Sequence, residues 1–80
     1  MDYMVIQETV LRIVKKNAPI DVPVDPDKPL NQVYGIDSLT LLNVLVDIED
    51  EFSFTFDMAE DLDAIFTSVR TICDYLQDKV

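Results

Sequence analysis

Residues 35–52 read GIDSLTLLNVLVDIEDEF, and this stretch decides the fold. Its apolar residues recur every three or four positions, which predicts an amphipathic helix over residues 38–52. One face of that helix is expected to pack into the core, and it holds Leu41, Val44, Leu45, Ile48 and Phe52. Asp37 stands where an N-cap is expected. Ser38 would then be the first helical residue, with its hydroxyl outside the bundle.

The same helix carries a second apolar face. This strip consists of Leu39, Leu42 and Val46, and Glu49 and Asp50 lie beside it. A bundle of 80 residues has too few helices to bury both faces, so we expect the strip to be exposed. Exposed apolar residues with a charged rim are typical of a transient docking surface. The alternative is that the proline-rich loop before the helix folds over the strip.

Three further helices are predicted. Residues 3–16 have apolar residues at helical spacing and end in two lysines, and Asn17 is a plausible C-terminal cap. A short acidic element is expected near residues 57–66, where Asp57 and Glu60 have the spacing of a capping box. The last helix is expected to start after residues 67–68.

Residues 17–36 form a long connection with four prolines, a density that no helix tolerates. Leu30 and Val33 are expected to hold this loop against the core, and a short extended piece is possible around Ile20, Val22 and Val24. We expect the two helices that it joins to run in the same general direction. The predicted fold is therefore an all-α, four-helix bundle with a short third helix and a long loop between helices 1 and 2. It forms one domain over residues 1–80.

The charge of the chain is uneven. The formal net charge is −10, of which residues 35–80 contribute −9, and no basic residue lies between Lys28 and Arg70. Nucleic acid and anionic membranes are unlikely partners because their phosphates would be repelled. A basic protein surface is the natural complement. The alternative is that the charge serves only to keep a small protein in solution.

The residue types present exclude several kinds of chemistry. The chain has no histidine, and Cys73 is its only cysteine, so an internal disulfide is impossible. Ser38 lacks the base and the G-x-S-x-G turn of a serine hydrolase. Serine beside aspartate is also common as a simple helix cap.

Cys73 is expected to be a buried apolar residue. No D-x-[DN]-x-[DN]-G calcium loop is present.

Targeting signals are also missing from the sequence. No basic segment leads into an apolar run at the start, and no apolar stretch approaches the roughly 18 residues of a membrane span. We expect a soluble, cytoplasmic protein.

The motif D-S-L at residues 37–39, followed by an apolar helix ending in E-D-E-F and then by a short acidic element, resembles the acyl carrier and peptidyl carrier protein family, free-standing type. In that family a separate transferase installs 4′-phosphopantetheine on the motif's serine, from coenzyme A and with magnesium. The resemblance implies that Ser38 is the attachment point, flanked by Asp37 and Leu39. It also implies that the arm holds substrates as thioesters and that the chain is not an enzyme.

The resemblance further implies a partner-binding face on residues 38–52, formed by Leu42, Val46, Glu49 and Asp50. The implied partners are a phosphopantetheinyl transferase, acyltransferases or ligases, and condensing or modifying enzymes with basic surfaces, acting on a monomer. Thr40 and Asn43 stand where many fatty-acid carriers have acids, which favours a polyketide or hybrid natural-product pathway. The alternatives are an aminoacyl or peptidyl carrier of nonribosomal peptide synthesis, and a helical adaptor without a prosthetic group.

Overall fold

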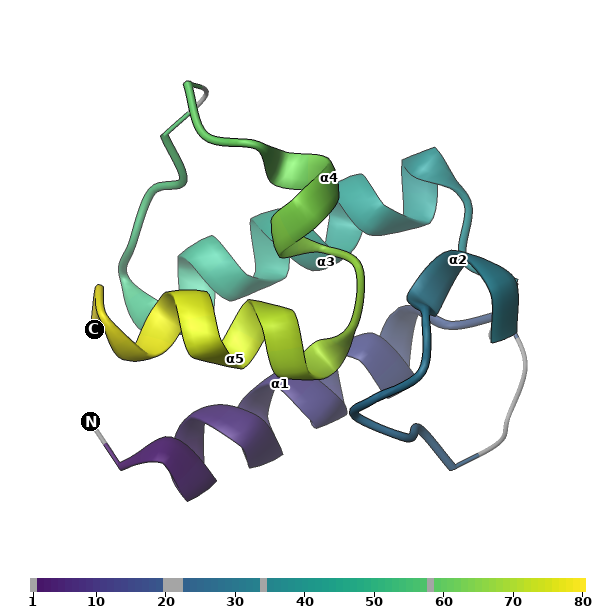
Figure 1. Cartoon of the computed structure of the whole chain (residues 1–80), viewed down its shortest axis with the longest axis horizontal. Helices are drawn as coiled ribbons and strands as arrows, with labels where there is room; N and C mark the ends of the chain where they lie inside the picture. The colour runs from purple at the N-terminus through teal and green to yellow at the C-terminus, as the bar shows by residue number, and fades with distance from the viewer. Residues whose placement is uncertain (1, 20–22, 34, 58) are drawn as a thin grey trace.

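A computed structural model describes residues 2–19, 23–33, 35–57 and 59–80, and the described regular structure is entirely helical (Figure 1). Four helices match the predicted ones: α1 (Tyr3–Asn17), α3 (Ser38–Phe52), the short α4 (Leu62–Ile65) and α5 (Val69–Gln77). A single further turn, α2 (Leu30–Val33), lies within the connection between α1 and α3. The predicted all-α bundle with a short third helix and a long first loop is therefore confirmed.

Helix α1 begins and ends through local hydrogen bonds. The Asp2 side chain accepts from the backbone amide of Met4, which caps the N-terminus. The C-cap is Ala18, so the prediction that Asn17 is the cap was wrong by one residue. Asn17 is the last helical residue, and its side-chain amide donates to the Ile13 carbonyl instead.

Helices α1 and α3 are antiparallel, so the expectation that they run in the same direction was wrong. Arg12 pairs with Glu51 at 2.6 Å and Lys16 with Asp47 at 3.5 Å, so one turn forward along α1 is one turn back along α3. In Figure 1 the end of α1 and the start of α3 lie at the same end of the bundle. The long loop therefore folds back on the molecule and does not span its length.

The core lies between α1, α3 and α5. The buried apolar residues are Ile6, Val10, Ile13, Val14, Leu30, Ile36, Val44, Ile48, Phe56, Ile65, Phe66, Val69, Ile72, Cys73 and Leu76. Of the predicted inner face of α3, Val44 and Ile48 are fully buried, and the other three residues are half-buried. Burial raises the pKa of the Cys73 thiol to about 11, which agrees with its expected role as a small apolar residue.

The loop before α3 is held against the start of α5. Leu30 is fully buried, as predicted, and its amide donates to the Thr67 carbonyl at 2.9 Å. The amide of Arg70 donates to the Pro26 carbonyl at 2.9 Å, and its guanidinium pairs with Asp27. The side chain of Val33 and the backbone of residues 20–22 lie outside the described residues, so the predictions made for them are not addressed.

Helix α4 begins later than the sequence predicts. Asp61, not Asp57, is its N-cap, because the Asp61 carboxylate accepts from the Ala64 amide. The Asp57 carboxylate accepts from the Ala59 amide within a preceding turn. A reciprocal capping box is present instead at the start of α5, where the Ser68 and Thr71 side chains each bond the other's backbone amide.

Candidate functional site

The start of α3 presents one exposed hydroxyl. The Asp37 carboxylate accepts from the Thr40 amide at 2.8 Å, so Asp37 is the N-cap, as predicted. Ser38 is the first helical residue, and it is exposed to solvent. The hydrogen bond from the Thr40 amide stabilises the charged carboxylate and lowers the pKa of Asp37 below its usual 3.8.

Gly35 positions the chain just before this cap. Its φ is +64°, in the left-handed region that residues with a Cβ rarely adopt. An added Cβ would meet only Pro19 Cγ, at the ordinary contact distance of 3.4 Å. The positive φ therefore explains why glycine occupies this position, and crowding by neighbouring atoms of the chain does not.

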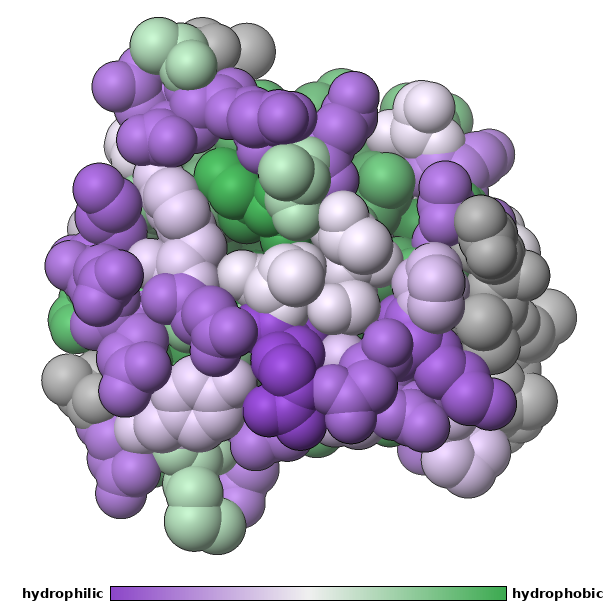
Figure 2. All heavy atoms as spheres, viewed as in Figure 1, coloured by the Kyte–Doolittle hydropathy of each residue, from purple (hydrophilic) through white to green (hydrophobic). Residues whose placement is uncertain are grey.

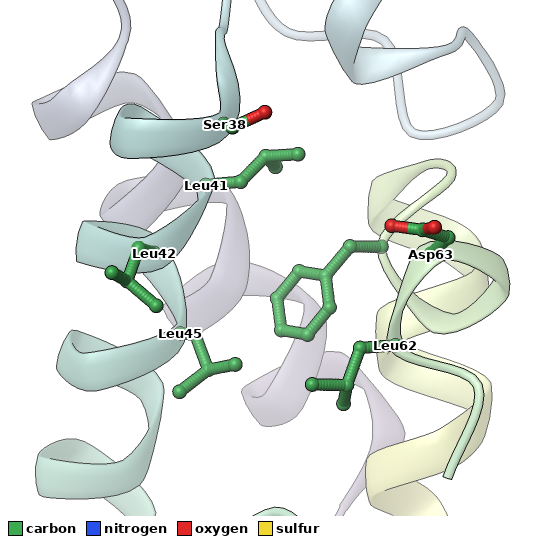
Figure 3. Close-up of a pocket in the computed structure, with 7 residues that line it drawn as sticks. Ser38, Leu41, Leu42, Leu45, Leu62 and Asp63 are labelled. Carbon is green, nitrogen blue, oxygen red and sulfur yellow. The ribbon is translucent and has the colours of Figure 1, made fainter. Parts of the chain in front are cut away.

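Ser38 lies at the edge of an open groove between α3 and α4 (Figure 3). The groove has a volume of about 160 Å³, and its other lining residues are Leu41, Leu42, Leu45, Leu62, Asp63 and Phe66. Leu41 and Leu45 point from α3 toward α4, and Leu62 points back from α4. On the face seen in Figure 2 hydrophilic residues predominate, and apolar residues show through mainly beside α4.

The second apolar strip of α3 is exposed. The side chains of Leu39, Leu42 and Val46 are 68%, 55% and 47% exposed, respectively. The proline-rich loop packs near α5 instead, through Leu30 and the contacts of Arg70. The alternative in which that loop buries the strip is therefore wrong, and the predicted exposure is confirmed.

The two acids predicted beside the apolar strip differ in their surroundings. Glu49 is half-buried, and its carboxylate accepts from the backbone amide of Phe56 at 2.8 Å. The chain thus turns back after α3, and Glu49 has a contact within the chain, while its role in partner binding stays a prediction. Asp50, the next residue, is exposed as expected.

A family model described as "Phosphopantetheine attachment site" matches residues 8–76 of the chain. The chain belongs to this family of carrier domains. Its cofactor is covalently attached 4′-phosphopantetheine, and it is a carrier and not an enzyme, as the sequence predicts.

A solved carrier protein has a similar structure. It is a chain in the "Crystal structure of Bradyrhizobium japonicum glycine:[carrier protein] ligase complexed with glycylated carrier protein". The TM-score is 0.67 and the sequence identity 27%, over 98% of this chain and 96% of that chain. No curated protein sequence matches this carrier. That carrier was solved in complex with a ligase, which supports enzymes as the general class of partner for carriers of this fold.

Two more acids of the carrier's α3 contact α1. The Asp47 carboxylate accepts from the Asn17 side-chain amide at 2.9 Å and lies 3.5 Å from Lys16 Nζ, and these contacts lower the pKa of Asp47. The Glu51 carboxylate pairs with Arg12. Both acids therefore lie on the α1 side of α3 and contact side chains of α1.

The described residues of the carrier contain no group of three metal-ligating side chains and no helix long and apolar enough to cross a membrane. What the carrier offers at the start of α3 is an accessible hydroxyl beside an apolar groove. The sequence identified the hydroxyl but missed the groove, because its two walls come from helices that are distant in the chain. For the second wall, the sequence offered only the four-residue spacing of Leu62 and Phe66, which places both on the same face of a helix.

Proposed function

We propose that this carrier bears its 4′-phosphopantetheine on Ser38 and presents thioester-bound intermediates to partner enzymes. The observation that supports Ser38 most is its exposed hydroxyl at the first residue of α3, within the region matched by the family model. The neighbouring backbone amides and the helix dipole favour a negative phosphodiester at this place.

Attachment would occur through the Ser38 hydroxyl. Its oxygen forms a bond to the phosphorus that bears the pantetheine unit of coenzyme A, and the bond from that phosphorus to adenosine bisphosphate breaks. The hydroxyl proton passes to a base of the transferase, since this chain has no histidine to accept it. Asp37 fixes the backbone at the start of α3 and so keeps the Ser38 side chain directed outward.

The terminal thiol of the attached arm supplies the chemistry of cargo transfer, by holding an acyl group as a thioester. The residues of the carrier present that arm to the enzymes that load and use it. A long tether raises the local concentration of cargo at each enzyme without tight binding. We propose that these enzymes include the transferase, a loading acyltransferase or ligase, and condensing or modifying enzymes.

The cargo we propose is an acyl intermediate of a polyketide or hybrid natural-product pathway. Neutral Thr40 and Asn43 on α3 argue against a housekeeping fatty-acid role, and the strong negative charge favours an acyl over an amino-acid carrier. A second candidate is an aminoacyl cargo. It is favoured by one specific observation, that the structurally similar carrier was seen in glycylated form with its ligase.

Mass spectrometry tests the attachment site. The purified protein is incubated with coenzyme A, magnesium and a broad-specificity phosphopantetheinyl transferase. We expect wild type to gain one arm and Ser38→Ala to gain none. The control is Ser53→Ala, which removes an exposed serine at the other end of α3 and should still gain one arm. A wild type without an arm, or an arm on Ser38→Ala, would contradict the proposal.

The same loaded protein distinguishes the two cargoes. It is offered in parallel to an acyltransferase with malonyl-coenzyme A, and to a glycine:[carrier protein] ligase with glycine and ATP. Formation of the malonyl thioester alone supports the acyl carrier. Formation of the glycyl thioester alone supports the second candidate.

A further inference from the structure

The basic residues of the carrier are concentrated in one part of the chain. Residues 11–28 hold four of its six bases and three of its sixteen acids, so this segment has a net charge of +1. All other residues together have a net charge of −11. The second half of α1 and the loop after it therefore differ in charge from the rest of a strongly acidic chain.

A shallow groove of about 210 Å³ lies between α1 and this loop, and we call it the α1 groove. Its lining residues are Leu11, Arg12 and Lys15 of α1, and Pro23 and Val24 of the loop. Three of these residues are apolar, and two carry a positive charge. The groove beside Ser38, by contrast, is lined by apolar residues together with the acid Asp63. The two grooves therefore suit ligands of different charge.

Lys15 is the cation of the α1 groove that is available to a partner. It is exposed, and its ammonium group has no ion pair among the residues that the structure describes. Arg12 pairs with Glu51 of α3, although 60% of the Arg12 side chain remains accessible. A carboxylate brought into the groove would thus meet one unpaired cation and the exposed part of a second.

The described acids near the groove have other contacts or lie apart from Lys15. Asp27 pairs with Arg70 of α5, and the Asp25 carboxylate accepts from the Asp27 amide. Glu8 is the only acid of α1, and it lies seven residues before Lys15, which corresponds to about 10 Å along the helix axis. The positive end of the groove is therefore the end beside Lys15.

We propose that the α1 groove is a second interaction surface of the carrier, which binds an acidic segment of a partner protein. The segment brings a carboxylate to Lys15 and an apolar side chain to Leu11 and Val24. Burial of the apolar side chain favours binding in any orientation, and the pairing of charges selects one direction for the segment. A second copy of the carrier is disfavoured as the occupant, because two chains of net charge −10 repel each other.

This surface has a requirement opposite to that of the strip on α3, for which a basic partner is expected. The two surfaces would therefore select partners of opposite charge. The inference goes beyond the proposed function and does not rest on it, because the α1 groove contains no residue of the proposed attachment site.

Nuclear magnetic resonance tests the α1 groove with a defined probe. The purified carrier is titrated at low salt with a short peptide in which two leucines are flanked by glutamates. We expect the amide signals of residues 11, 12, 15 and 24 to shift, and those of residues 39, 42 and 46 to stay unchanged. Added salt should weaken the binding, because it screens the pairing of charges. The same peptide with glutamines in place of the glutamates should bind about fivefold more weakly.

Two lysine variants with the same net charge locate the contact. Lys15→Gln removes the unpaired cation of the groove and should weaken binding of the acidic peptide by about fivefold. The control is Lys28→Gln, which removes an exposed lysine of the loop that does not line the groove. It should change the affinity by less than about twofold. Circular dichroism checks that both variants are folded.

Three outcomes overturn the inference. The first is that the peptide causes no shifts, or shifts only signals of α3. The second is equal affinity of Lys15→Gln and Lys28→Gln for the peptide. The third is a dimer of the peptide-free carrier in analytical ultracentrifugation that Lys15→Gln dissociates, which would assign the groove to a second copy. The assay needs no phosphopantetheine arm, so a failure of Ser38 to accept one would leave this inference standing.

Discussion

At the scale of single residues, Ser38 depends on the residue before it. Asp37 has an extended backbone, and its carboxylate accepts a hydrogen bond from the Thr40 amide, so that Ser38 starts the helix and is exposed. Such a cap satisfies one of the four unpaired amides at a helix start. The chemistry proposed for Ser38 therefore depends on a neighbouring carboxylate that takes no part in it.

The lowered pKa of Asp37 predicts how this cap responds to acid. A carboxyl whose pKa is lower in the folded state stabilises the protein above its unfolded value of 3.8, and the stabilisation is lost as the pH falls through the folded value. We expect Asp37→Asn, which keeps a cap but not the charge, to unfold a few degrees below wild type at pH 7. The two melting curves should converge below pH 3.8.

Thermal unfolding followed by circular dichroism between neutral and acidic pH measures this difference. Thr55→Ala, a change at an exposed position outside the helices, serves as the control. A difference between wild type and Asp37→Asn that persists unchanged in acid would show that the charge of Asp37 does not contribute to the cap.

The sequence predicted the positions of Asp37 and Ser38 at the start of the helix, because a helix cap is local. It did not indicate the contact that Glu49 makes within the chain, although helical spacing places this residue beside the apolar strip. Helical spacing gives the direction of a side chain from a straight helix, but it says nothing about where the chain goes next. Here the chain turns back after α3, and the backbone amide of Phe56, seven residues later, donates a hydrogen bond to the Glu49 carboxylate.

At the scale of elements, α3 carries out two roles on its two faces. The inner face buries Val44 and Ile48 in the core, and the outer face leaves the side chains of Leu42 and Val46 about half exposed. A helix that is apolar nearly all round is normally buried on all sides. In α3 the outer apolar face is instead available for contact with another protein.

Matched aspartates on the two faces distinguish these roles. Ile48→Asp places an unpaired charge where the exposed fraction is 0%, and we expect it to cost more than about 4 kcal/mol and to unfold the domain. Val46→Asp places the same group at a 47% exposed position, so the fold should remain. It should nevertheless impair modification by the transferase. Circular dichroism and the transferase assay give the two readouts.

The reverse result would show that the two faces are assigned the wrong way round. In that case Ile48→Asp would be folded and soluble, while Val46→Asp would unfold.

The two faces of α3 could be predicted from the sequence, because fifteen residues at a constant period leave little doubt about which side chains share a face. The short α4 could not be placed as well, since four residues offer no period and two aspartates compete as its cap.

At the scale of the whole molecule, the antiparallel packing of α1 and α3 determines where the long loop between them packs. Because it need not span the bundle, the loop packs beside α5 and leaves the outer face of α3 uncovered. The sequence could not show this direction. The relevant contacts, Arg12 with Glu51 and Lys16 with Asp47, join residues more than thirty positions apart.

Two kinds of contact hold this loop, and their strengths differ. Leu30 is fully buried, whereas the ion pair between Asp27 and Arg70 is exposed, with 64% and 49% of the two side chains accessible. Exposed ion pairs contribute little because water screens them and ordering two long side chains costs entropy. Burial of a leucine side chain is the larger effect.

We therefore expect Leu30→Ala to lower the free energy of unfolding by about 2–5 kcal/mol, whereas Asp27→Asn should change the urea midpoint only slightly. The slope of unfolding against urea should stay the same in both variants if the loop unfolds together with the helices. Urea denaturation of the two variants beside wild type measures both quantities. A large loss for Asp27→Asn with a small loss for Leu30→Ala would mean that charge, and not burial, holds the loop beside α5.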